Sequence, residues 1–126
     1  RINLKDSSDE IVKKIKKAKT DSAPIPDNIE DLKERTEALN LLNIYGELTN
    51  NSSNNVLKEM SGKDFSYVKS KLSEALVDTI CPIGRKIEQY MKDKGFLTDV
   101  LKKGREKATI KSEENLKKIR DIVGFI

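Results

Sequence analysis

The sequence contains no histidine and no tryptophan, and it has a single cysteine, Cys81. Without histidine, no mechanism that depends on an imidazole is available. A single cysteine excludes an internal disulfide and a metal site built from cysteine alone. Proline and glycine are also scarce, at 3 and 6 of 126 residues, and aromatic residues make up only 5%. This scarcity argues against a sandwich or barrel, which needs many turns, and favours helices.

Long hydrophobic runs are absent as well. None approaches the ~20 residues of a membrane span, and no signal peptide opens the chain, so we expect a cytoplasmic protein without a membrane role. Charge is abundant: 25 Lys and Arg against 21 Asp and Glu give a net charge of +4. This mildly basic balance suggests a polyanionic partner without establishing one. The first residue is Arg1 and not Met, which indicates a piece of something longer.

Apolar residues recur every three or four positions along most of the chain, which is the spacing of amphipathic helices. The pattern predicts helices over residues 8–19, 34–48, 56–60, 65–91 and 97–123. Pro24 and Pro26 indicate an irregular linker over residues 23–33. We therefore predict three segments: 1–22 with a basic connecting helix, the linker 23–33, and a helical domain over 34–126.

The predicted fold is all-α, a bundle of about four to five helices that includes a long antiparallel pair. Pro82 should kink the first helix of this pair without ending it, because the apolar stripe continues beyond it. The stripe of residues 65–91, with Leu72 and Ile83, should face that of residues 97–122. Only residues 2–4 read as extended.

The residues offer little for catalysis. There is no Ser-His-Asp set, no metal-ligand cluster and no glycine-rich phosphate loop, so we predict neither a catalytic residue nor a metal site. Cys81 lies in an apolar helical run and is expected to be a small buried hydrophobe.

Basic residues near the turn at Gly62 offer a second kind of chemistry. Lys63 and Lys69 flank Tyr67, which lies off the apolar stripe and could stack on an unpaired base. Phe65 fits the stripe and is expected in the core. The last helix carries further cations, including Lys107. A solvated charged surface is the alternative interpretation for all of these lysines.

Several motifs together resemble the tryptophanyl-tRNA synthetases, in unbroken order along the chain. Residues 2–4 and 9–22 resemble the stretch after the KMSKS loop, and residues 40–45 resemble the family's "NLLxIY" helix. Gly62, Lys63, Phe65 and Lys69 fit its "GKxYxxFK" turn, with Val68 in place of the second aromatic. The pattern Leu101-x-x-Gly104-x-x-Lys107-Ala108 and the ending at residues 119–125 also fit. The similarity is to bacterial members.

The resemblance implies a class I synthetase that activates tryptophan with ATP and Mg²⁺ and charges tRNA(Trp), usually as a homodimer. This chain corresponds to the C-terminal part, with the anticodon-binding domain. The catalytic signatures are absent, so the fragment itself should bind no cofactor and catalyse nothing. The resemblance makes Lys69 the first candidate for an anticodon contact, with Lys63 and Tyr67 near it and Lys107 as a further candidate.

Two other functions remain open from the residues alone. A helical scaffold or protein-interaction module without a nucleic-acid role has the same composition. A helix-turn-helix DNA-binding protein is a weaker alternative, because the charge is spread over several helices and not gathered on one recognition helix.

Overall fold

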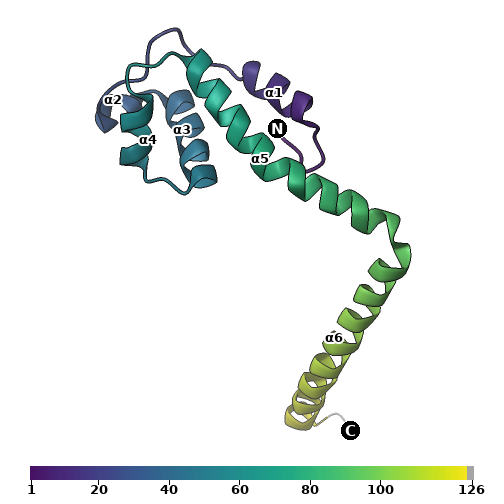
Figure 1. Ribbon diagram of the computed structural model, residues 1–126. Helices are drawn as coiled ribbons and strands as arrows, with labels where there is room; N and C mark the ends of the chain where they lie inside the picture. The colour runs from purple at the N-terminus through teal and green to yellow at the C-terminus, as the bar shows by residue number, and fades with distance from the viewer. Residues whose placement is uncertain (125–126) are drawn as a thin grey trace. The chain divides into compact units, whose positions relative to one another are not determined.

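The computed structural model describes residues 1–124, and all regular structure within them is helical. The helices in chain order are α1 (Ser8–Lys16), α2 (Ile29–Glu34), α3 (Thr36–Thr49), α4 (Ser53–Met60), α5 (Phe65–Lys92) and α6 (Lys94–Val123) (Figure 1). The predicted all-α class is confirmed, with more helices than expected. The chain divides into two compact units, Arg1–Lys86 and Ile87–Ile126. None of the described helices is apolar over a stretch long enough to cross a bilayer.

Helix α1 begins at a capping box, as the sequence pattern indicates. The Ser7 hydroxyl accepts a hydrogen bond from the backbone N–H of Glu10, and the Glu10 carboxylate accepts one from the backbone N–H of Ser7 at 2.8 Å. Ile11 and Ile15 are buried one turn apart on the face that joins the core. The helix ends at Lys16, earlier than predicted.

The predicted irregular linker contains a short helix, so this part of the prediction is wrong. Helix α2 begins after Asn28, whose side chain accepts a hydrogen bond from Asp31 N–H at 2.8 Å. Pro24 and Pro26 precede this cap and therefore do not disturb the helix. Leu32 is 3% exposed and anchors α2 to the core.

The core of the first unit lies between α1, α3, α4 and the first half of α5 (Figure 1). The predicted stripe of α3 is largely confirmed, since Leu41, Leu42 and Tyr45 are buried. Ile44 of the same helix is 39% exposed. In α5, Phe65, Val68, Leu72 and Leu76 are buried as expected.

Helix α5 continues through Pro82, as predicted. Just beyond it, Gly84 lies against the N-terminal segment: a Cβ at this position would be 2.8 Å from the carbonyl oxygen of Leu4. The N-terminal segment forms no strand; it turns where Asp6 N–H donates to Asn3 O at 3.1 Å. Ile83, expected in the core, is 40% exposed.

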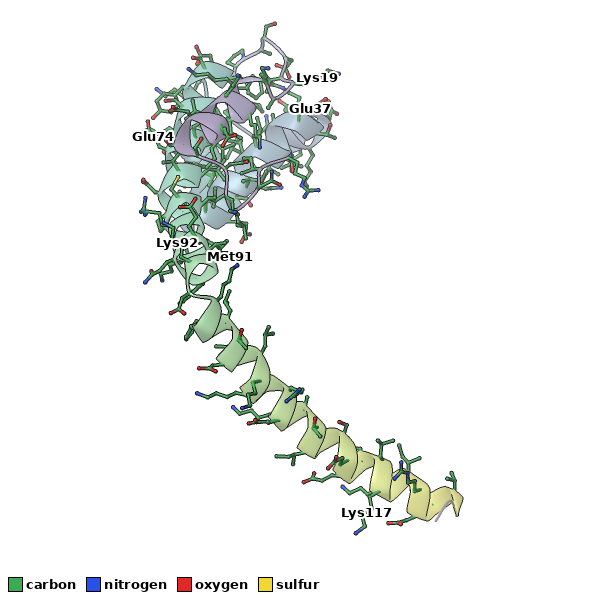
Figure 2. The ribbon with its side chains drawn as sticks, turned by 90° about the vertical axis from the view of Figure 1, so that its right-hand side faces the viewer. Lys19, Glu37, Glu74, Met91, Lys92 and Lys117 are labelled. Carbon is green, nitrogen blue, oxygen red and sulfur yellow. The ribbon has the colours of Figure 1, made fainter. Side chains whose placement is uncertain are left out.

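The second unit consists of the end of α5 and helix α6. The break between the helices is at Asp93, whose carboxylate accepts a hydrogen bond from Phe96 N–H at 2.9 Å, so α6 begins at Lys94 and not at residue 97 as predicted. Helix α6 is unbroken, but none of its residues is buried. Within the second unit, the apolar stripe of α6 is therefore not buried as predicted, and side chains project from all around the helix (Figure 2). Phe125, the end of the last motif, lies outside the described residues.

Candidate nucleic-acid interface

The turn between α4 and α5 carries one of the predicted contact residues, Lys63. Gly62 has a φ of 70°, a conformation that glycine adopts without steric cost. Its N–H donates to Ile25 O at 2.9 Å, and Ile25 N–H donates to Lys63 O at 2.9 Å. Ile25 is 2% exposed. The turn is thus fixed from both sides by a buried residue of the linker.

Asp64 directly precedes α5 and caps its first turn. Its carboxylate accepts a hydrogen bond from Tyr67 N–H at 2.8 Å, and its backbone carbonyl accepts one from Val68 N–H. Because Phe65 and Val68 face the core, Tyr67 lies outside the buried stripe, as predicted.

Lys63 and Tyr67 are brought together by this geometry. The Nζ of Lys63 lies 5.4 Å from the centroid of the Tyr67 ring, within the range of a cation–π contact. Tyr67 is 37% exposed and Lys63 is also exposed, so both are open to a ligand. An aromatic face beside a cation matches what an unpaired base and its phosphate require.

Phe65 has a structural role, as expected. It is 7% exposed, and the guanidinium carbon of Arg35 lies 5.5 Å from its ring centroid. Arg35 is a residue that the sequence patterns did not single out. It lies inside the predicted helix 34–48, where no local pattern marks it for a structural role, and its partners Asp21, Ala23 and Pro24 come from the preceding segment.

The side chain of Lys69 is bonded to the segment at the end of α1. Its Nζ donates to the carbonyl oxygens of Ala18 at 2.8 Å and Lys16 at 3.4 Å, at the C-terminal end of α1. The last carbonyls of a helix lack intrahelical partners and carry partial negative charge, so an ammonium group stabilises them. Lys107 is exposed on α6, in the other unit.

Acidic residues also lie close to the candidate pair. Glu59 of α4 accepts a hydrogen bond from the Tyr45 hydroxyl at 3.0 Å. Burial and this carboxylate raise the pKa of Tyr45 above its ordinary value. On α5, Lys71 pairs with Glu74 at 3.2 Å, and that bond raises the pKa of Lys71. The surface around Tyr67 is therefore of mixed charge, with the ammonium group of Lys63 over the ring.

A groove of about 960 Å³ runs between α1 and α5. Val12, Phe65 and Val77 contribute apolar surface to it, and its polar lining includes Lys16, Lys69 and Glu74. In residues 1–124, no group of three or more Cys, Asp and Glu residues could hold a metal ion.

Comparisons with known proteins agree on one family. The family model "tRNA synthetases class I (W and Y)" matches residues 1–80. The tryptophan–tRNA ligase of Rhizobium meliloti (strain 1021) is 40% identical over all 126 residues, which span 36% of that protein. That of Caulobacter vibrioides is 38% identical over 99% of the chain and 36% of the relative. That of Rickettsia typhi is 40% identical over the whole chain and 38% of the relative. The chain thus spans little more than a third of these relatives.

Proposed function

The chain belongs to the class I tRNA synthetases (W and Y), and we propose that it is the C-terminal, anticodon-binding part of a tryptophan–tRNA ligase. In this proposal the whole enzyme activates tryptophan with ATP and Mg²⁺ and transfers it to tRNA(Trp), as a homodimer in the cytoplasm. The choice of tryptophan is supported by relatives that match the chain along its full length.

The observation that carries the RNA-binding role is the exposed Tyr67 ring beside the Nζ of Lys63. Single-stranded RNA is commonly bound by an aromatic ring that stacks on a base and by a cation that meets the phosphate. An anticodon loop presents unpaired bases of this kind. Tyr67 is the base-stacking residue in this proposal, and Lys63 contacts the adjacent phosphate.

Lys69 and Lys107 are secondary contacts in the proposal. An ammonium group has three donors, and the bonds of Lys69 to Ala18 and Lys16 leave one for a phosphate. Lys107 is exposed on a helix with nine Lys and Arg residues against five Asp and Glu residues, which suits a polyanion.

The test separates tRNA charging from amino-acid activation in the full-length enzyme. Lys63→Ala and Tyr67→Ala should each weaken charging of tRNA(Trp) and leave tryptophan-dependent ATP–pyrophosphate exchange unchanged, since activation needs no tRNA contact. Lys58→Ala, an exposed lysine of α4, is the matched control. Unchanged charging in both variants would favour the alternative, a helical module without a nucleic-acid role.

A further inference from the structure

Arg35 joins the linker to the rest of the first unit through one guanidinium group. Its Nε and one Nη donate to the two carboxylate oxygens of Asp21, at 3.0 and 2.6 Å. The remaining donors bind the backbone carbonyl oxygens of Ala23, at 2.9 Å, and of Pro24. Four hydrogen bonds from a single side chain therefore fix residues 21–24, a segment without regular secondary structure.

The guanidinium carbon of the same group lies 5.5 Å from the ring centroid of Phe65, the first residue of α5. Arg35 thus binds residues 21–24 through its N–H groups and contacts the start of α5 at the Phe65 ring. Immediately after the bound segment, Ile25 makes the two backbone hydrogen bonds with Gly62 and Lys63. A continuous set of contacts leads from Arg35 to the turn that carries Lys63, and through α5 to Tyr67.

We propose that Arg35 is a positioning residue for the RNA-contacting pair Lys63 and Tyr67. This inference rests on the proposed function of that pair. By holding the linker against the Gly62 turn and covering Phe65, Arg35 fixes the backbone from which both contact residues project. A ligand that meets a preorganised site does not have to order it, and this increases affinity.

An arginine suits this task and a lysine does not. The planar guanidinium group offers five donors in a fixed fork and stacks on aromatic rings, whereas an ammonium group is a point charge. The side chain of Arg35 is only 21% exposed, and its charge is paired with Asp21. Arg35 is therefore occupied within the protein and does not contact RNA itself.

The experiment uses the full-length ligase with the substitutions Arg35→Ala, Arg35→Lys and Asp21→Asn. Lys33→Ala, which removes an exposed cation of α2, is the control. The measurements are KM for tRNA(Trp) and kcat in charging, the rate of pyrophosphate exchange, and the dependence of tRNA binding on salt. Circular dichroism at the assay temperature reports whether each variant is folded.

Arg35→Ala should raise KM for tRNA about fivefold to tenfold, as expected when one coupling between neighbouring residues is lost, while kcat and exchange stay unchanged. Arg35→Lys should recover at most about half of the change in log KM that Arg35→Ala causes, because lysine keeps the charge and lacks the planar fork of donors. Asp21→Asn should also raise KM for tRNA. A double variant with Arg35→Ala and Asp21→Asn should have a KM no higher than that of Arg35→Ala alone.

Salt dependence separates positioning from contact. Lys63→Ala should reduce the salt slope of binding by about 0.7 for a lost single-strand phosphate contact, whereas Arg35→Ala should leave the slope unchanged. The inference is overturned if Arg35→Ala leaves KM for tRNA unchanged, or if it reduces the salt slope of tRNA binding. If circular dichroism shows that Arg35→Ala has lost helix, the same two measurements on Asp21→Asn test the inference.

The failure of this inference differs from a failure of the proposed function. If Tyr67→Ala and Lys63→Ala weaken charging but Arg35→Ala does not, the inference is wrong and the RNA site stands. If none of the three changes charging, the proposed function is wrong, and the inference falls with it.

Discussion

The Nζ of Lys69 lies 2.8 Å from the carbonyl oxygen of Ala18, a residue 51 positions earlier in the chain. This hydrogen bond ties the start of α5 to the C-terminal end of α1. It gives Lys69 a structural role that its position in a family motif does not reveal. The bond adds to the packing of Ile11 and Ile15 of α1 in the core that α5 shares.

Replacing Lys69 by alanine should therefore destabilise the first unit. The carbonyls at the end of α1 lose a charged donor, and we expect the free energy of unfolding to fall by about 1–2 kcal/mol. The measurement is urea unfolding followed by circular dichroism. Lys86→Ala, which removes an exposed lysine of the same helix, should change stability by less than about 0.5 kcal/mol. Equal stability of the two variants would contradict the structural role.

Sequence periodicity predicted α5 well because a long apolar stripe at this spacing is typical of an amphipathic helix. It could not predict what covers each part of the stripe. Leu72 is buried and Ile83 is exposed, although both fit the same pattern. The apolar stripe of α6 has the same period and is not buried at all. Periodicity identifies a face of a helix, while burial depends on chain segments elsewhere in the sequence.

The candidate site likewise has features that the local sequence predicts and features that depend on remote segments. The exposure of Tyr67 followed from its place off the stripe, which is a local property. The direction of Lys69 and the role of Arg35 depend on α1 and on the linker, and no local pattern encodes them. Pro24 and Pro26 disfavour a helix where they stand, but both precede the cap at Asn28, and the short helix α2 begins just after it.

Leu72→Ala and Ile83→Ala should differ in their effect on stability. Leu72 is fully buried, and its truncation should cost about 2–5 kcal/mol through lost burial and a cavity. Ile83 is 40% exposed, and its truncation should cost about 1 kcal/mol or less. Chemical unfolding of both variants measures the difference. A cost at Ile83 as large as that at Leu72 would show that the exposed face is covered in solution.

Two glycines of the long helices should respond in opposite ways to alanine. A Cβ at Gly84 would lie 2.8 Å from Leu4 O, so Gly84→Ala should displace the N-terminal segment and destabilise the first unit. Gly104 has nothing within 4 Å of its virtual Cβ, so Gly104→Ala should stabilise α6 by about 0.5–1 kcal/mol through helix propensity. Thermal unfolding compares them, and a stabilising Gly84→Ala would refute the close approach.

Acid should weaken the attachment of the N-terminal segment. The Lys14 ammonium group, and then the Asn3 backbone N–H, hold the pKa of Asp6 below its ordinary value of 3.8. A carboxylate with a lowered folded-state pKa contributes its full stability above that ordinary value and loses it as pH falls through the folded-state pKa. Asp6→Asn should therefore lower stability at pH 7 and flatten its pH dependence below pH 3.8. Unfolding curves recorded from pH 7 downward test this, and an unchanged acid limb in the variant would contradict it.

Base stacking on Tyr67 is the central claim, and the affinity of the full-length ligase for tRNA(Trp) at fixed salt tests it most directly. Tyr67→Phe keeps the aromatic face and should bind within about twofold of the original enzyme. Tyr67→Ala removes the face and should bind more weakly by about 1–3 kcal/mol, the range for one stacked base. Equal affinity of the alanine and phenylalanine variants would contradict stacking on this residue.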